Sequence, residues 1–255
     1  GIEPACQPLK FAALPGPAAR YTARHTARHV SPCHAALDPP AAKENPTMST
    51  PAPSTTPSAS ADYPPDLVIA DTVRWLERAV IGLNLCPFAK GVHVKGQIHY
   101  VVSQASDARA LAEELQQELE ALAEISPEKR DTTLLIAPHC LHDFLDFNDF
   151  LALADDLVEA MDLGGILQVA AFHPQFQFDG TELDDVTNAT NRAPYPTLHL
   201  LREDSIDAAV AVFPEAETIY ERNMQVLREL GPEGWAKLDV GARCPITGAS
   251  GASGA

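Results

Sequence analysis

Apolar residues recur at helical spacing from about residue 66 onward. They are Ile69, Val73, Leu76, Val80 and Leu83. Trp75 adds a large apolar surface to this first predicted helix. Pro87 disfavours helical geometry in the residue before it and cannot continue the hydrogen-bond ladder, so we expect the helix to end between Asn84 and Cys86.

Three later segments have the same helical period. The first follows the N-cap residues Ser106 and Asp107 and buries Leu111, Leu115, Leu119 and Leu122. The second begins near Asp146, ends at Gly164-Gly165 and places apolar residues at 147, 150, 151, 157, 158 and 161. A last helical region begins after Ser205 and is divided by Pro214.

Four short runs between these helices predict strands, at residues 98–103, 132–137, 166–172 and 197–202. The third run is apolar almost throughout, which is typical of a strand covered on both faces. Helices separate the first three strands, so we expect right-handed βαβ crossovers and parallel pairing. The predicted fold class is α/β: a single domain over residues 66–238, with a small, mostly parallel sheet, one antiparallel strand, and helices packed on it.

Composition predicts disordered tails on both sides of this domain. Thirteen of the 22 prolines lie within residues 1–66, and residues 1–65 show no apolar period. Met48 is followed by Ser49-Thr50-Pro51, so residues 1–47 are expected to be translated upstream sequence; an arginine-containing transit peptide is the alternative. Residues 239–255 are rich in Gly, Ala and Ser and are expected to be a second disordered tail.

Charge and cysteine content indicate which partners and which cellular setting are expected for this protein. Residues 48–255 carry 13 Lys/Arg against 32 Asp/Glu, and this acidic balance disfavours nucleic acid and membrane surfaces as partners. No apolar run approaches the roughly 20 residues that span a bilayer. The five cysteines do not form a disulfide framework, which favours a reduced, cytoplasmic setting.

Ligands of open α/β sheets bind beyond the carboxyl ends of the strands, and this rule points to the polar segment from His173 to Pro196. A connection of this length is more often a lid or binding loop than a plain link. If the fourth strand runs antiparallel, His199 approaches His173. The two histidines with Asp184 or Asp185 would be reasonable acid/base groups, or ligands for a divalent metal such as zinc, iron or manganese. Their spacing matches no established metal motif, and a lone histidine at a strand end is commonly a hydrogen-bonded core residue.

The same segment holds candidates for binding a small anionic ligand. They are Asn188, Asn191, Arg192, Tyr195 and Arg202. Guanidinium groups recognise carboxylate or phosphate bidentately, although Arg192 and Arg202 could equally pair with Asp184, Asp185 or Glu203.

Cys86 is the candidate nucleophile of a third hypothesis. At the end of the first helix the macrodipole raises a thiol pKa, which favours an inert, buried cysteine. If Pro87 instead opens a new helical turn and places the sulfur at its positive end, the macrodipole lowers the thiol pKa, which favours a reactive cysteine.

Four segments, in this order along the chain, carry a family resemblance. They are GLNLCPFA (82–89), DFLDFNDF (143–150), FHPQFQF (172–178) and NRAPYPTLHLLR (191–202). Over residues 71–238 the chain resembles the bacterial family called domain of unknown function 1415, in which serine is more usual at the position of Ala193. The resemblance implies one domain that excludes the residues before Met48, and it implies no activity.

Two functional classes follow. The first is an enzyme, metal-assisted or acid/base, that acts on a small anionic substrate at residues 173–202. The second is a non-catalytic ligand-binding or protein-interaction module, in which the same segment is a recognition loop.

Overall fold

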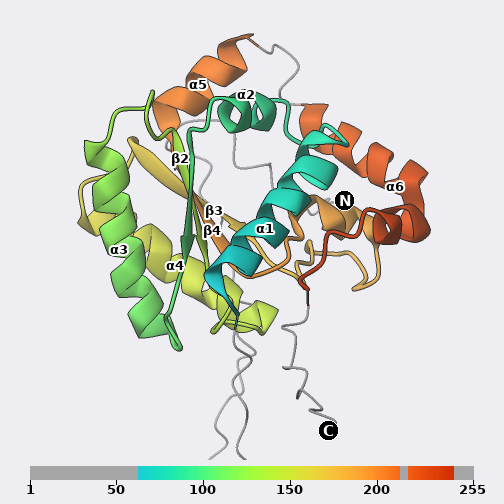
Figure 1. Ribbon diagram of the computed structural model, residues 1–255, viewed down its shortest axis with the longest axis horizontal. Coiled ribbons are helices and arrows are strands. Elements are labelled where there is room, and N and C mark those ends of the chain that lie inside the picture. The colour runs from blue at the N-terminus through green and yellow to red at the C-terminus, as the bar shows by residue number, and fades with distance from the viewer. Residues whose placement is uncertain (1–62, 213–217, 244–255) are drawn as a thin grey trace, which may run out of the picture. The chain divides into compact units, whose positions relative to one another are not determined.

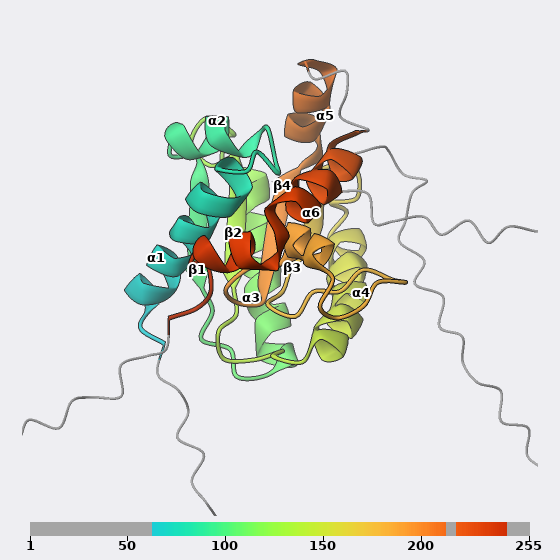
Figure 2. The same cartoon turned by 90° about the vertical axis from the view of Figure 1, so that its right-hand side faces the viewer.

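The structure is a computed structural model that describes residues 63–212 and 218–243. In these ranges four strands form one sheet: β1 (Ile98–Val102), β2 (Thr132–Ile136), β3 (Leu167–Phe172) and β4 (Thr197–Arg202). Helices pack on both of its faces, as Figures 1 and 2 show from two directions. The predicted α/β class is confirmed. Of the tails predicted over residues 1–65 and 239–255, residues 1–62 and 244–255 lie outside the described residues, as does Pro214.

The sheet has the strand order β1-β2-β4-β3. β1 and β2 pair in parallel, as a βαβ crossover requires. β4 is antiparallel, as predicted, but it lies between β2 and β3, so that His199 is opposite both Leu134 and Ala170. β3 therefore runs in the direction of β1 and β2 without pairing with them. At this sheet edge the inner residues 168–171 are only partly buried, so the expectation of a strand covered on both faces is wrong.

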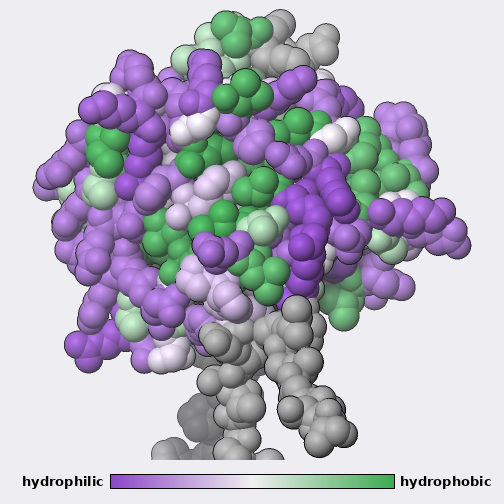
Figure 3. Space-filling model, viewed as in Figure 1, coloured by the Kyte–Doolittle hydropathy of each residue, from purple (hydrophilic) through white to green (hydrophobic). Residues whose placement is uncertain are grey.

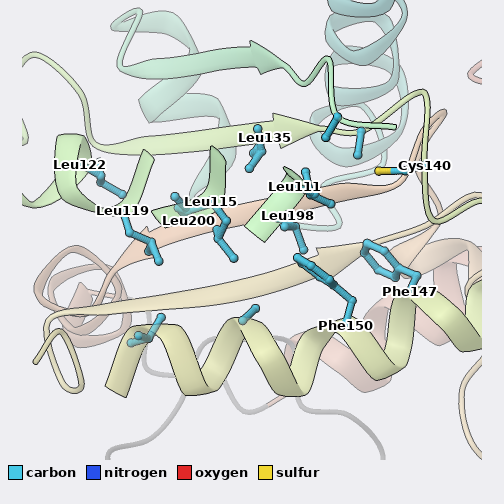
Figure 4. Packing of buried hydrophobic residues seen from close by; sticks show 14 of the residues in the cluster. Leu111, Leu115, Leu119, Leu122, Leu135, Cys140, Phe147, Phe150, Leu198 and Leu200 are labelled. Carbon is cyan, nitrogen blue, oxygen red and sulfur yellow. The ribbon is translucent and has the colours of Figure 1, made fainter. Parts of the chain in front are cut away.

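Two long helices, α3 (Ala108–Glu124) and α4 (Phe144–Ala160), cover one face of the sheet. Asp107 and Asp143 cap them by accepting backbone N–H bonds from the first turn. The predicted leucine stripe of α3 is fully buried, and Figure 4 shows it meeting the phenylalanines of α4 and the leucines of β4. Each fully buried leucine contributes roughly 2 kcal/mol through the hydrophobic effect.

The opposite face carries α1 (Pro65–Trp75), which continues directly into a π-helix, η1 (Leu76–Ile81). A Cβ at Gly82 would collide with the carbonyl group of Arg78, so glycine is required at this position. The helical path then stops at Asn84, whose φ is 54°, as the sequence predicts. The π-helix is not predicted by the sequence; such segments are rare and often lie near functional sites.

The buried side of α1 differs from the predicted one. Ile69 and Val73 are only partly buried, whereas Asp71 and Thr72 are buried. Trp75 sets this orientation, since its ring lies 5.0 Å from that of Phe172 at the end of β3. The helix thus turns a charged residue toward the protein interior.

Three shorter or peripheral helices complete the described part. α2 (Ala89–Val94) follows Pro87 and was not predicted, and α5 (Glu203–Val212) has no buried residue. α6 (Ile219–Lys237) packs on the 3-10 helix η2 (Val186–Asn191), with Leu227 against Ala189 and Leu85. None of the described helices combines the length and apolar character needed to cross a bilayer.

The chain remains packed beyond residue 238, where the sequence predicts a disordered tail. Val240 is buried, and Arg74 donates hydrogen bonds of 2.7 Å to the carbonyl groups of Asp239 and Gly241. Ordered packing therefore extends to residue 243, the last in this described range.

Arg202 closes the C-terminal end of α3. Its guanidinium is buried and donates to the carbonyl groups of Leu122 (2.5 Å), Ile125 and Arg130. The last carbonyl groups of a helix have no partner within the helix, so a side chain must satisfy them when they are buried. Arg202 performs this task at the end of the sheet opposite His173.

We expect Arg202→Leu to lower the free energy of unfolding by about 3 kcal/mol, because it removes the donors of several buried carbonyl groups. Urea denaturation followed by circular dichroism measures this change. Arg109→Ala is the control: it removes only an exposed pair with Glu113 and should leave the midpoint almost unchanged. Equal midpoints for the Arg202 variant and the wild type would contradict the capping role.

Candidate functional site

The segment between β3 and β4 is folded onto the domain rather than open. Phe176 and Phe178 are buried, with ring centres 5.0 Å apart, and Phe176 also contacts Phe144 of α4. The segment then forms η2, which α6 covers. Its polar residues must be judged by where their hydrogen bonds go.

His173 is fully buried, and both of its ring nitrogens are used. Nε2 donates to the carbonyl group of Leu141 (3.1 Å), and Nδ1 accepts the N–H of Gln175 (3.0 Å). This pattern requires the neutral ring with its proton on Nε2. Burial lowers the pKa of His173, which also favours the neutral ring. In this arrangement neither nitrogen has a lone pair free for a metal ion.

The two acidic residues of the predicted site have different surroundings. Asp184 is exposed. Asp185 caps η2, where it accepts the backbone N–H (2.8 Å) and the hydroxyl (2.7 Å) of Thr187. These two bonds lower the pKa of Asp185. The helix η2 thus begins directly after Asp185.

Asn188 is fully buried and bonds only within the segment. Its Oδ1 accepts the N–H of Phe178 and the hydroxyl of Thr181, both at 2.9 Å, and its Nδ2 donates to the carbonyl group of Glu182. This amide holds the two halves of the loop together.

Arg192 and Asn191 also bond to backbone groups. Arg192 donates from Nε to the carbonyl group of Phe176 (3.0 Å) and from Nη2 to that of Leu183 (2.7 Å). Asn191 donates to the carbonyl group of Ala171. The contacts of Arg192, Asn191 and Asn188 therefore shape the segment, and Arg202 lies at the other end of β4.

His199 lies on the sheet face that α1 covers, and its ring is 5.9 Å from that of Phe172. Burial lowers the pKa of His199 to about 4. Within residues 63–212 and 218–243, no three His, Cys, Asp or Glu side chains form a group that could hold a metal ion. The predicted set of His173, His199 and Asp184 is thus not gathered around one point.

Cys86 has the helical environment that we considered as the alternative. Pro87 does open a new turn, and hydrogen bonds from the backbone of Phe88 and Ala89 lower the pKa of the thiol. Burial has the larger effect, however, and raises the pKa of Cys86 overall. The sulfur packs against the cluster that contains Trp75.

A buried charge network lies where α1, the start of β4 and the C-terminal segment meet. Asp71 is fully buried, and its Oδ1 accepts a 2.5 Å hydrogen bond from Nη1 of Arg74. Its Oδ2 accepts the hydroxyl of Tyr195 (2.9 Å) and the backbone N–H of Arg243 (2.8 Å). Burial, followed by the contact with Asp71, raises the pKa of Tyr195, so this phenol stays protonated.

Arg243 adds a second guanidinium to this carboxylate. Its Nε lies 3.5 Å from Oδ1 of Asp71, and 53% of its side chain is exposed. Neither of its Nη atoms has a hydrogen-bond partner in the described part of the chain. The network of Asp71, Arg74 and Arg243 therefore holds one positive charge more than its carboxylate balances.

Two further rings extend the network across the carboxyl edge of the sheet. The ring of Tyr63 lies 5.6 Å from that of Tyr195 and 5.7 Å from that of His139, edge-on in both cases. His139 follows β2, and its ring has no hydrogen-bond partner among residues 63–212 and 218–243. Contacts thus run without a break from the guanidinium of Arg243 through Asp71, Tyr195 and Tyr63 to the imidazole of His139.

Sequence reasoning found Tyr195 but missed Asp71, Arg74 and Arg243. Asp71 and Arg74 are three residues apart, a spacing that makes side chains neighbours on one helix face. This spacing was the signal in the sequence that indicated their ion pair. The apolar period predicted a different buried face, which includes neither Asp71 nor Arg74. Arg243 was placed in a tail, where nothing in the sequence predicts order.

The fold and this site define a mixed α/β domain with a buried charge network at the carboxyl edge of its sheet. The chain belongs to the family described as Protein of unknown function (DUF1415), whose model matches residues 67–237. This confirms the resemblance carried by the four sequence segments. No curated protein and no solved structure matches the chain.

The low pKa of His199 predicts a pH dependence of stability. Above the unfolded-state pKa of about 6.5 the ring is neutral in both states. As pH falls toward about 4, only the unfolded chain gains this proton, so the free energy of unfolding decreases by up to about 1.4 kcal/mol per pH unit. Denaturation between pH 7 and 4.5 should show a steeper loss for the wild type than for His199→Leu. The same pH dependence of the free energy of unfolding in both proteins would contradict the low pKa of His199.

The raised pKa of Cys86 predicts slow alkylation. Because the thiolate is the reactive form, iodoacetamide at pH 7 should modify Cys86 at least about tenfold more slowly in the folded protein than in urea. Peptide mapping by mass spectrometry separates Cys86 from the other cysteines. A folded-state rate equal to or above the unfolded rate would instead support nucleophilic chemistry.

Proposed function

We propose that this domain binds a small anionic ligand at the carboxyl edge of its sheet, with Arg243 as the contacting residue. The observation that supports this proposal is the unbalanced charge of the network, in which Asp71 faces both Arg74 and Arg243. The proposal keeps the ligand class expected from the sequence. It assigns the binding to different residues: Tyr195 belongs to the predicted segment 173–202, whereas Asp71, Arg74 and Arg243 lie outside it.

The roles within the network differ. Arg74 is buried and bonded to Asp71 and to two backbone carbonyl groups, so it positions the C-terminal segment. Arg243 is half exposed and can direct its Nη groups outward. A guanidinium presents paired N–H donors that match a carboxylate or a phosphate, so Arg243 can bind either group.

The acidic surface of the domain does not oppose this binding strongly. Charges beyond about 8 Å are largely screened at physiological ionic strength, so the nearest groups decide whether an anion binds. The carboxylate that contacts Arg243 is that of Asp71, which Arg74 also contacts, and Asp239 in the same segment is paired with Arg78. A bound anion would balance the remaining positive charge.

An enzymatic version of this proposal assigns acid/base chemistry to His139, whose imidazole lies beside Tyr63. Histidine is the side chain most often used for proton transfer in catalysis. The non-catalytic version uses the same residues for recognition alone. Both versions require the anion to bind first. Anion binding is therefore the step to be measured.

We expect Arg243→Gln to weaken binding of benzoate and of inorganic phosphate at least about tenfold, because a charged hydrogen-bonding partner is lost. Titrations followed by heteronuclear NMR measure the dissociation constants and report whether the fold is kept. Arg109→Gln, which replaces an exposed arginine on α3, is the matched control and should bind like the wild type.

Two results would reject the proposal. One is that neither probe binds at about 10 mM, which would leave the network a purely structural device. The other is binding that Arg243→Gln does not change.

A further inference from the structure

β3 is an edge strand: β4 pairs with one side of it, and no other strand of the described residues pairs with the other side. In an antiparallel ladder the backbone groups of alternate residues point toward the partner strand or away from it. The N–H of Glu203 donates to the carbonyl group of Ile166, so the even-numbered residues of β3 face β4. The backbone groups of Leu167, Val169 and Ala171 therefore point outward.

Two of these outward groups have partners at the ends of the strand. The N–H of Leu167 donates to the carbonyl group of Leu163 (3.0 Å), and the carbonyl group of Ala171 accepts the side-chain amide of Asn191 (3.5 Å). The carbonyl group of Leu167, both groups of Val169 and the N–H of Ala171 have no partner within residues 63–212 and 218–243. Val169 and Ala171 are only partly buried, so this row of donors and acceptors is open to solvent.

β3 has none of the features that usually protect an edge strand. Its sequence, LQVAAF, contains no charged residue, no proline and no glycine, and its register with β4 runs without a bulge. An open edge of this kind can accept an extended segment as an additional strand. Because Leu163 and Asn191 occupy the outward groups at the two ends, the added segment would pair over residues 167–171.

The charge around β3 indicates which kind of segment would bind there. Residues 131–191, which include α4, β3 and most of the connection to β4, contain twelve Asp or Glu and no Lys or Arg. α4 packs on β3, on the side of the Val169 side chain. A second copy of this chain would bring two such acidic regions together, whereas a basic segment would be attracted to one.

The other edge of the sheet, at β1, differs in charge. Figure 2 shows β1 beside α1, on the side of the sheet opposite β3 and α4. Residues 63–130 carry seven Lys or Arg, and Figure 3, seen from this side, shows hydrophilic side chains around smaller apolar areas. The N–H of Ser103 donates to the carbonyl group of Ile136, so the odd-numbered residues of β1 face β2 and the N–H of Val102 points outward. β1 thus supplies a matched edge without the uniform negative charge.

We propose that the outer edge of β3 binds an extended, basic segment of a partner protein, which adds a strand to the sheet. In antiparallel pairing, Val169 would exchange two hydrogen bonds with the residue opposite. The carbonyl group of Leu167 and the N–H of Ala171 would each form one more. Basic side chains of the segment on the same face as Val169 would lie beside α4 and its carboxylates. This site does not involve Arg243, and it does not depend on the anion site.

A synthetic peptide in which lysine and valine alternate over about seven residues is the probe. Hydrogen exchange of the full chain, followed by NMR, should show that the peptide slows exchange of the amides of Val169 and Ala171 and leaves those of Tyr100 and Val102 unchanged. We expect a dissociation constant on the order of 100 µM at low salt, with weaker binding as salt screens the charges. The same peptide with glutamate in place of lysine should bind at least about tenfold more weakly.

Val169→Pro should weaken binding of the lysine peptide at least about tenfold, because it removes the central outward donor. Proline is tolerated in an edge strand where the N–H faces solvent, so the ladder with β4 should be kept. Val102→Pro is the matched control: it removes an outward N–H from β1 and should bind the peptide like the wild type. Circular dichroism checks that both variants are folded, and if Val169→Pro is not, the exchange measurement on the wild type decides.

Five results would overturn the proposal. Three concern the peptide: unchanged exchange of Val169 and Ala171 at about 1 mM peptide, equal affinity for the glutamate peptide, and binding that Val169→Pro does not weaken. Protection of these two amides in the free chain at low concentration would show that another part of the chain covers the edge. A dimer in sedimentation velocity that Val169→Pro dissociates would assign the edge to a second copy instead.

Discussion

The buried carboxylate of Asp71 is the constraint on which the arrangement of α1, β4 and the C-terminal segment depends. A charge removed from water is costly unless every lone pair finds a donor. Arg74, Tyr195 and the backbone of Arg243 supply those donors from three separate parts of the chain. Loss of any one partner would leave part of a buried charge unsatisfied, so these three elements are held in one relative position.

The long connection between β3 and β4 shows that a dense set of polar residues need not be a binding site. Such a connection has no strand ladder to satisfy its backbone, and side chains must do so instead. Asn188, Asn191 and Arg192 bond to carbonyl and N–H groups of the segment or of the adjoining strand. Its polarity is explained largely by folding, and groups outside it became the stronger candidates for chemistry.

The anion site proposed at the carboxyl edge of the sheet would select its ligand by charge. At the carboxyl edge, two guanidinium groups share one carboxylate, so an anion is favoured. α1 contributes both Asp71 and Arg74 to this site.

The sequence by itself determined the four strands and the longer helices of this protein, because local spacing and capping act over a few residues. The leucine stripe of α3, its Asp107 cap and the stop near Asn84 all follow from such rules. Only the tertiary structure decided that β4 lies between β2 and β3, that α1 turns Asp71 inward and that residues 239–243 are ordered. These features depend on contacts between residues as far apart as Asp71 and Arg243, and no local period records which distant partner will satisfy a buried group.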